Sequence, residues 1–327
     1  MHCFNIVFMS SERFSDCNIK KTGGSIWVHL AAILAVTAWG VSFINTRVLM
    51  DSGFTPVEVF LYRCVIAYVL LLCFSYKSMR PRNFRHEMLF MLCGLCGGSV
   101  YFLAENTALV YTSTTNVSLI TSTSPLINAL LVGIMYRDER PGRGLVLGSF
   151  IAMAGVIMVI LGGSGTPHTP ESEAAGNGIL GDSLSLMAAV CWSVYALILR
   201  KLNPFYSAIT ITRKTFFYGL ITALPFLMLE PLTVTWQTIM QTEVWTNLLI
   251  LSVFSSSLAY VIWAWVIGKI GAVKAGNYSY FQPVVTLIFS ALVLNEAVGP
   301  FGIVGCIVTI FGVYAGEKLN FRHRLIH

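Results

Sequence analysis

The sequence has few charged residues for its length. Only 11% of its 327 residues are Asp, Glu, Lys or Arg, whereas 56% are hydrophobic, and the mean hydropathy is +0.73. Soluble domains carry roughly 25% charged residues. A chain this poor in charge cannot cover itself with a wetted surface. The composition therefore excludes a soluble globular protein and predicts an integral membrane protein.

Motifs for several kinds of chemistry are also missing. The sequence has no GxxxxGK[ST] phosphate-binding loop, so nothing in it indicates nucleotide-driven pumping. Its six histidines are scattered, and no His/Cys cluster has metal-ligand spacing, so we expect no cofactor and no metal. Cys93 and Cys96 form a CxxC, but it lies among glycines in an apolar run, which favours small-residue helix packing. We expect a protein that is not an enzyme.

The basic residues do not form a nucleic-acid-binding patch. The net charge is +6, but the Lys and Arg residues are spread between apolar runs, so we expect no nucleic-acid partner. Residues 1–26 are polar and mixed and lack the basic-then-apolar order of a secretory signal. We expect them to form a cytosolic N-terminal tail.

Long apolar runs dominate the rest of the chain. A membrane-spanning helix needs about 20 apolar residues. Ten segments qualify: 27–49, 57–76, 88–110, 114–135, 144–162, 179–200, 207–229, 245–267, 272–294 and 300–317. The connection 163–178 is rich in Gly, Pro, Ser and Glu and separates them into two groups of five. We predict a five-helix repeat over 27–162, a linker, a second repeat over 179–317 and a basic cytosolic tail over 318–327.

The connections between these segments alternate in charge. Lys and Arg gather in the connections at 77–85, 137–143, 200–201 and 269–274. The other connections carry no Lys or Arg, and all of them except the short one at 111–113 carry Asp or Glu. By the positive-inside rule, the basic connections face the cytoplasm. We therefore expect a multi-pass protein of the plasma (cell inner) membrane with both termini in the cytoplasm.

A pattern of Pro, Glu and Gly occurs twice, as internal repeats do. Five residues recur 157 positions later and one proline recurs 158 positions later. The matched pairs are Glu139 and Glu296, Gly142 and Gly299, Gly148 and Gly305, Gly155 and Gly312, Val156 and Val313, and Pro125 and Pro283. Because five helices per repeat is an odd number, the second repeat must cross the membrane in the opposite sense. The sequence predicts an all-α integral membrane fold of ten transmembrane helices arranged as two inverted five-helix repeats, the architecture of many secondary transporters.

These motifs resemble the drug/metabolite transporter superfamily, and within it the ten-helix EamA-type transporters. The resemblance extends over about residues 27–317 and rests on a combination of motifs that are each weak alone. They are Ala38-Trp39-Gly40, Ala108 to Ser113, Pro125 and Glu139 in the first half, and Gly271-Ala272, Pro283, Glu296 and Gly312-Val313 in the second. The resemblance implies a monomeric or loosely associated carrier whose central cavity is lined by the first, third, fourth, sixth, eighth and ninth helices.

The two repeated prolines lie near the middle of the membrane. Pro125 is about 11 residues, or roughly 17 Å, into its segment, and Pro283 is about as deep. Each removes a helical hydrogen bond, to the carbonyl of Thr121 or Ser279. Such a kink should face protein or a water-filled cavity, because an unsatisfied carbonyl in hydrocarbon is costly. Polar residues gather here, so we predict a solute cavity lined by Asn116, Thr121, Pro125, Asn277, Tyr280, Gln282 and Pro283.

Trp39 and Trp192 occupy matching positions midway along their segments. Interfacial tryptophans lie at helix ends, and these do not. One interpretation is an aromatic wall of the cavity, which stacks on a ring or holds a cation. The alternative is inward packing alone.

Arg63 and Glu105 are charged residues inside predicted spans. Arg63 is roughly 9 Å and Glu105 roughly 7–8 Å below the outer edge. A lone charge at this depth costs several kcal/mol, so we expect the two to pair. Glu105 is then either a proton-coupling group or the contact of a solute amine, or the pair is a structural latch. The matching residue in the second half is Trp263, so the fold itself does not require a carboxylate here.

We expect a secondary transporter that moves a small organic metabolite, an amino acid, amine or related compound, by alternating access. We favour export coupled to protons, with the solute, protons and membrane lipid as the partners. A nucleotide-sugar or sugar-phosphate exchanger of the same superfamily is the alternative; it would need midplane basic residues, for which Arg213 and Lys214 are the candidates. A membrane enzyme and a passive pore or scaffold are less favoured.

The charge pattern makes a direct prediction about topology. Tags placed at the two ends of the chain should both be reached by a membrane-impermeant label only after the cytoplasmic side is opened. A tag in the 163–178 connection should be labelled in intact cells. Ends that label on opposite sides of the membrane would contradict the inverted repeat.

Overall fold

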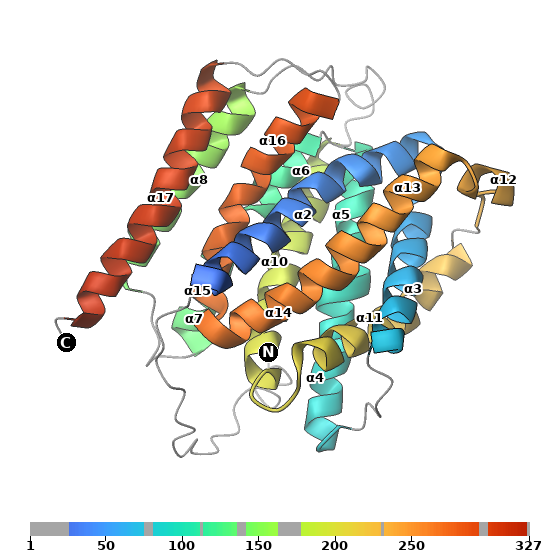
Figure 1. The fold of residues 1–327 in the computed structure, drawn as a ribbon, viewed down its shortest axis with the longest axis horizontal. Coiled ribbons are helices and arrows are strands. Elements are labelled where there is room, and N and C mark those ends of the chain that lie inside the picture. Colours follow the sequence, from blue (N-terminus) through green and yellow to red (C-terminus); the bar gives the residue numbers. More distant parts are fainter. Residues whose placement is uncertain are drawn as a thin grey trace.

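The computed structural model describes residues 26–74, 81–111, 114–135, 142–162, 178–229, 232–293 and 300–325. Within these ranges all regular secondary structure is helical (Figure 1), which confirms the all-α prediction. The expected tail at 1–26 apart from Ile26, which begins the first helix, most of the expected linker, and the repeat residues Glu139 and Glu296 lie outside the described residues.

The first half consists of five helical segments. They are α2 (Ile26–Asp51), α3 (Pro56–Phe74), the continuous rod of α4 (Phe84–Gly94), η1 (Leu95–Ser99) and α5 (Val100–Tyr111), the pair α6 (Thr114–Thr121) and α7 (Ser124–Met135), and α8 (Arg143–Gly162). Local sequence explains where they begin. Thr55 and Glu58 form a reciprocal capping box at the start of α3, and the Asn83 side chain accepts a hydrogen bond from the His86 N–H at the start of α4.

The second half has five corresponding segments. They are α10 (Gly178–Leu202), α11 (Ala208–Leu229), the rod of α13 (Thr242–Ile250), η3 (Leu251–Leu258) and α14 (Ala259–Ile270), the series α15 (Ala272–Asn277), η4 (Tyr278–Tyr280) and α16 (Phe281–Val293), and α17 (Pro300–Leu325). A short helix, α12 (Trp236–Ile239), precedes α13. Helix α17 continues to Leu325 instead of ending at 317, so the expected tail from 318 on is helical as far as Leu325.

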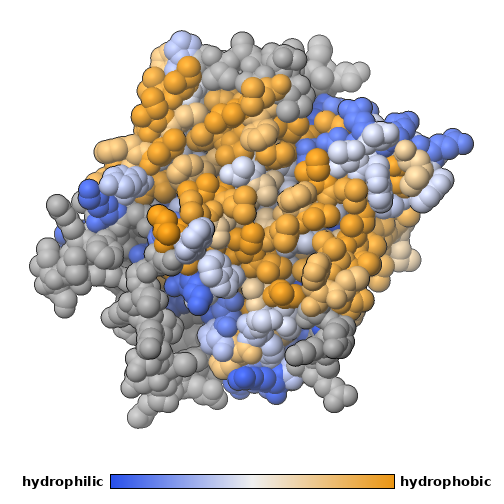
Figure 2. All heavy atoms as spheres, viewed as in Figure 1, coloured by the Kyte–Doolittle hydropathy of each residue, from blue (hydrophilic) through white to orange (hydrophobic). Residues whose placement is uncertain are grey.

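The helices have the length and surface of membrane-spanning elements. Five are long and apolar enough to cross a membrane: Ile26–Asp51, Pro56–Phe74, Phe84–Tyr111, Ile179–Leu202 and Thr242–Ile270. Shorter apolar helices cover Ser124–Met135, Val146–Gly155 and Pro300–Gly316. Figure 2 shows a hydrophobic band across the face formed by α17, α16, α2, α13 and α14, with hydrophilic residues gathered towards its two edges. The chain is therefore a multi-pass membrane protein.

The contacts between the two halves are symmetric: when each helix is replaced by its counterpart in the other half, the same pairs are in contact. By order along the chain, α2 corresponds to α10, α3 to α11, α5 to α14 and α7 to α16. Helix α2 packs against α16, and its counterpart α10 packs against α7. Likewise α5 contacts α10 as α14 contacts α2, and α3 contacts η3 as α11 contacts η1. With an odd number of segments in each half, this pseudo-two-fold axis lies in the membrane plane.

The irregular backbone also recurs in the two halves. The π-helical turns η1 and η3 interrupt corresponding rods. The fourth segment breaks at Ser122 and Thr123, just before Pro125, and the ninth passes through the 3-10 turn η4 before Pro283. Each proline thus lies in the first turn of a new helix, where its missing N–H needs no partner.

Hydroxyl groups donate hydrogen bonds to carbonyls just before the first of these breaks. Thr121 Oγ1 donates to the Val117 carbonyl at 2.7 Å, and Ser122 Oγ donates to the Ser118 carbonyl at 2.6 Å. Thr123 Oγ1 donates to the Ile120 carbonyl at 2.6 Å. The Ser/Thr-rich sequence before Pro125 therefore gives its own hydroxyl groups partners within the broken segment.

The repeated glycines hold α8 and α17 together, and the two helices lie side by side in Figure 1. A Cβ atom added to Gly148 would lie 2.3 Å from Gly316 Cα, and one added to Gly155 would lie 2.4 Å from the Thr309 nitrogen. A Cβ added to Gly312 would meet the Ala152 nitrogen at 2.4 Å. These glycines recur because the two backbones touch where they cross, as in small-residue packing between membrane helices.

Gly148→Ala should therefore destabilise the protein, and Gly133→Ala should not. A methyl group at 148 collides with backbone atoms, which costs about 1–3 kcal/mol as overpacking does, whereas a Cβ at Gly133 meets nothing within 4 Å. Thermal unfolding of the purified variants in the same detergent measures the difference. Equal melting temperatures for the two variants would contradict the close crossing of α8 and α17.

Candidate functional site

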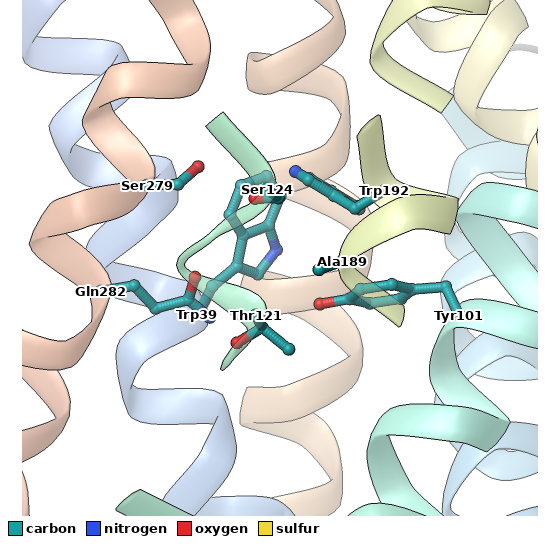
Figure 3. Close-up of a pocket in the computed structure, with 8 residues that line it drawn as sticks. All are labelled: Trp39, Tyr101, Thr121, Ser124, Ala189, Trp192, Ser279 and Gln282. Carbon is teal, nitrogen blue, oxygen red and sulfur yellow. The ribbon is translucent and has the colours of Figure 1, made fainter. Parts of the chain in front are cut away.

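A small cavity lies where the two halves meet. It is lined by four residues from each half: Trp39, Tyr101, Thr121 and Ser124 from the first, and Ala189, Trp192, Ser279 and Gln282 from the second (Figure 3). The centre of a water molecule can move through about 10 Å³ of this cavity. This is about the smallest volume that holds one water molecule. This conformation therefore leaves room for little more than a water molecule, and a larger molecule could enter only if the cavity widened.

Aromatic rings form one wall of the cavity. The rings of Trp39 and Trp192 meet edge to face, with centroids 4.9 Å apart and an interplanar angle of 87°. Trp39 Nε1 donates to the Ser255 carbonyl at 3.0 Å, which fixes its indole against η3. Trp263 packs behind Trp39 at 5.1 Å. The paired tryptophans thus line the cavity and pack inward at the same time.

The remaining lining side chains are polar but neutral, or small. Ser279 is 3% exposed, and among the described residues its Oγ has no hydrogen-bond partner. It comes from η4, the irregular turn that precedes Pro283. Burying a hydroxyl group without a partner is costly, so Ser279 offers a donor and an acceptor to whatever enters. In the described part of the chain, no charged side chain lines the cavity.

A carboxylate lies one helical turn behind the lining. Tyr101 Oη donates to Glu105 Oε1 at 2.8 Å, and the two residues are four positions apart on α5. Glu105 is only 7% exposed. The cavity is therefore connected to a buried acidic group through a single phenol.

Arg63 is held elsewhere. Its Nε donates to Ser256 Oγ at 2.9 Å, and its guanidinium carbon lies 4.2 Å from the centroid of the Phe102 ring. Among the described residues no ion pair joins Arg63 directly to Glu105, although the two charges interact through space. The expected direct pair is absent, because the guanidinium group is hydrogen-bonded to Ser256 of η3 and lies over the Phe102 ring.

The predicted cavity residues fall into two groups. Trp39, Thr121, Trp192 and Gln282 line the cavity. Four others do not: Asn277 accepts a hydrogen bond from Ser149, Tyr280 packs with Ala152 and Val313, Pro125 lies against Gly276, and Pro283 is buried. The side chain of Asn116 lies outside the described residues. The prolines mark the breaks, and the residues just before them reach the cavity.

Four lining residues were not among those predicted from the sequence: Tyr101, Ser124, Ala189 and Ser279. Ala189 has no polar group to draw attention to it. Tyr101 had one usable indication, because it lies four residues before Glu105 and therefore on the same face of the helix.

Comparison with known proteins identifies the family. The model of the EamA-like transporter family matches residues 26–161 and again residues 179–315. The chain belongs to the EamA-like transporter family. Two copies of one family unit in tandem agree with the two-fold contacts of the helices.

Relatives of this transporter are found in archaea, bacteria and plants. An uncharacterized transporter of Archaeoglobus fulgidus is 28% identical, over 88% of this chain and 96% of that protein. The uncharacterized transporter YetK of Bacillus subtilis is 24% identical over 90% of each chain, and the protein WALLS ARE THIN 1 of Arabidopsis thaliana is 24% identical over 88% of this chain and 81% of its own. A crystal structure with 18% identity shares the fold, with a TM-score of 0.71 over 91% of this chain and 99% of that chain.

Adding bulk at the breaks should block transport. Ser279→Leu and Thr121→Leu would fill a cavity that already has little room, whereas Ser279→Ala and Thr121→Val keep the side-chain volume close to the original. We expect the leucine variants to lose at least about tenfold in transport rate and the small variants to be mild. The measurement is solute flux in proteoliposomes, once the thermal-shift screen described below has supplied a solute. Full activity in both leucine variants would show that the solute passes elsewhere.

Proposed function

We propose that this transporter is a secondary carrier that exports a small organic metabolite bearing an amino group, such as an amino acid or an amine, by alternating access. The observation that carries this proposal is the cavity at the junction of the two halves, to which each half gives four residues. A site on a pseudo-two-fold axis can be reached from either side when one set of symmetric contacts replaces the other. Membership of the family supports transport in general and leaves the solute open.

The chemistry of the lining supports an amino group. Tryptophan and tyrosine faces attract cations, and Trp39, Tyr101 and Trp192 all line the cavity. Behind them, Tyr101 is hydrogen-bonded to the Glu105 carboxylate. Ser279 and Gln282 add neutral hydrogen-bonding groups that suit a carboxylate or carbonyl elsewhere on the solute.

The lining of the cavity suits an amine better than a phosphorylated sugar. Phosphate recognition draws on Arg and Lys, and no cation of the described residues lines the cavity. Lys214, one of the two basic candidates, donates to Glu87 Oε1 at 2.7 Å and lies over the Phe90 ring. Its charge is thus committed to a contact between α11 and α4.

Glu105 is the group we assign to proton coupling. Burying an acidic group inside a membrane protein is costly, so its presence indicates a function in binding a solute or an ion. The residue that corresponds to Glu105 in the second half is Trp263, so packing alone does not require a carboxylate. With the termini in the cytoplasm of a plasma-membrane protein, the end of α5 faces outside, so Glu105 lies in the outer half of the pathway and takes up protons from there.

A thermal-shift screen of the purified protein should identify the solute class. Amino acids and organic amines should raise the melting temperature, because a ligand of the folded state stabilises it, whereas sugar phosphates and nucleotide sugars should not. Stabilisation by a sugar phosphate alone would favour the exchanger.

Glu105→Gln should then abolish transport driven by a pH gradient. The variant keeps the shape and hydrogen-bonding capacity of the side chain, so its melting temperature should stay close to that of the native protein. Flux of the identified solute in proteoliposomes with and without a pH gradient provides the measurement. Unchanged coupling in Glu105→Gln would remove Glu105 from the proton pathway.

A further inference from the structure

Tyr101 contacts both the cavity and the buried carboxylate. Its ring packs against Trp192 with centroids 5.1 Å apart, and it is 9% exposed. Figure 3 shows its hydroxyl group directed towards the middle of the cavity, between Trp39 and Thr121. The same hydroxyl group donates to Glu105 at 2.8 Å. Any solute that fills the cavity must therefore meet the phenol before it can reach Glu105.

Few other groups act on Glu105. Arg63 on α3 interacts with it through space, and Tyr101 is its hydrogen-bond donor. From the neighbouring helices α10 and α6, the residues beside Tyr101 at the cavity are Ala189, Trp192 and Thr121, none of which carries a titratable group. Tyr260 of α14 also lies in this aromatic cluster, but its hydroxyl group donates to the Gly97 carbonyl. The hydroxyl group of Tyr101 is thus the contact that solute binding can most directly replace.

We propose that Tyr101 is the coupling residue of this carrier: its hydroxyl group holds Glu105 as a carboxylate behind the cavity wall, and an organic ammonium group entering the cavity displaces the phenol and pairs with that carboxylate. The inference deepens the proposed function, on which its transport role rests. It assigns Tyr101 a positioning role, because the phenol acts through Glu105.

Charge balance follows from the shared carboxylate. Glu105 pairs either with one ammonium group or with one proton, because both require the same oxygen atoms. When the ammonium leaves towards the outside, the carboxylate takes one proton from that side and later releases it inside. One cation moves outward for each proton that moves inward, so the exchange transfers no net charge. Between these two states, the hydroxyl group of Tyr101 donates a hydrogen bond to the carboxylate.

The first test needs no solute. The infrared band of the protonated Glu105 carboxyl group, identified as the band missing from Glu105→Gln, is followed against pH in the purified full-length protein. Tyr101→Phe keeps the ring but removes a donor that favours the charged form. The midpoint of protonation should therefore move to higher pH by about one unit, since a hydrogen bond to a charged group contributes roughly tenfold or more. Tyr260→Phe, which removes a buried phenol bonded elsewhere, should leave the midpoint unchanged.

The second test uses a charged probe and its neutral partner. Phenethylammonium should compete with protons and lower the midpoint in the native protein, whereas 2-phenylethanol, which has the same ring and no charge, should not. In Tyr101→Phe the phenethylammonium affinity measured at high pH should rise several-fold, because the ammonium no longer has to displace a hydrogen bond. A structural role alone would lower affinity together with melting temperature.

The outcomes separate the two proposals. A midpoint that is the same in Tyr101→Phe and the native protein overturns the coupling role of Tyr101, whatever is transported. An equal response to phenethylammonium and 2-phenylethanol overturns the assignment of an ammonium group. Failure of the proposed function shows separately, as proteoliposomes of the native protein that carry no amine while the infrared midpoint still shifts in Tyr101→Phe.

Discussion

Hydrocarbon offers no hydrogen bonds, and this constraint governs the structure. A backbone that leaves the α-helix inside the membrane must find its partners within the protein. The chain does so at paired places: the breaks before Pro125 and Pro283, and the π-helical turns η1 and η3. At the first break, the hydroxyl groups of Thr121, Ser122 and Thr123 donate to carbonyls of the preceding turn. Irregular backbone is thereby confined to the interior where the two halves meet, and the cavity forms there.

The two halves share one arrangement of helices but differ in some of their buried side chains. The helices exchange their contacts under a two-fold operation, and Trp39 and Trp192 face each other across it. Glu105 and Trp263 occupy equivalent places but differ in kind. One side of the pathway therefore carries a carboxylate with a phenol donor, and the other carries an indole buried among aromatic rings.

Much of the fold could be read from the sequence because the membrane makes composition decisive. Apart from the end of α17, which runs on to Leu325, the segment bounds agree within a few residues, and the repeated glycines lie where α8 and α17 cross. The site was less accessible. Periodicity placed Thr121 and Gln282 near the midplane, but it could not show that Pro125 packs on Gly276 while the residues before it face the cavity. Which side of a helix meets the opposite half depends on how the halves dock.

By itself, the sequence determined that the chain is helical, lies in a membrane, repeats once and is inverted, because hydropathy, charge placement and spacing each act along the chain. The tertiary structure alone decided which side chains meet. It placed Arg63 on Ser256 rather than Glu105, and Tyr101 between the cavity and that carboxylate. It also made Glu58, near the start of α3, a buried acceptor for the Thr233 and Val234 N–H groups. These contacts join residues far apart in sequence, and their partners are set by the packing of one half against the other.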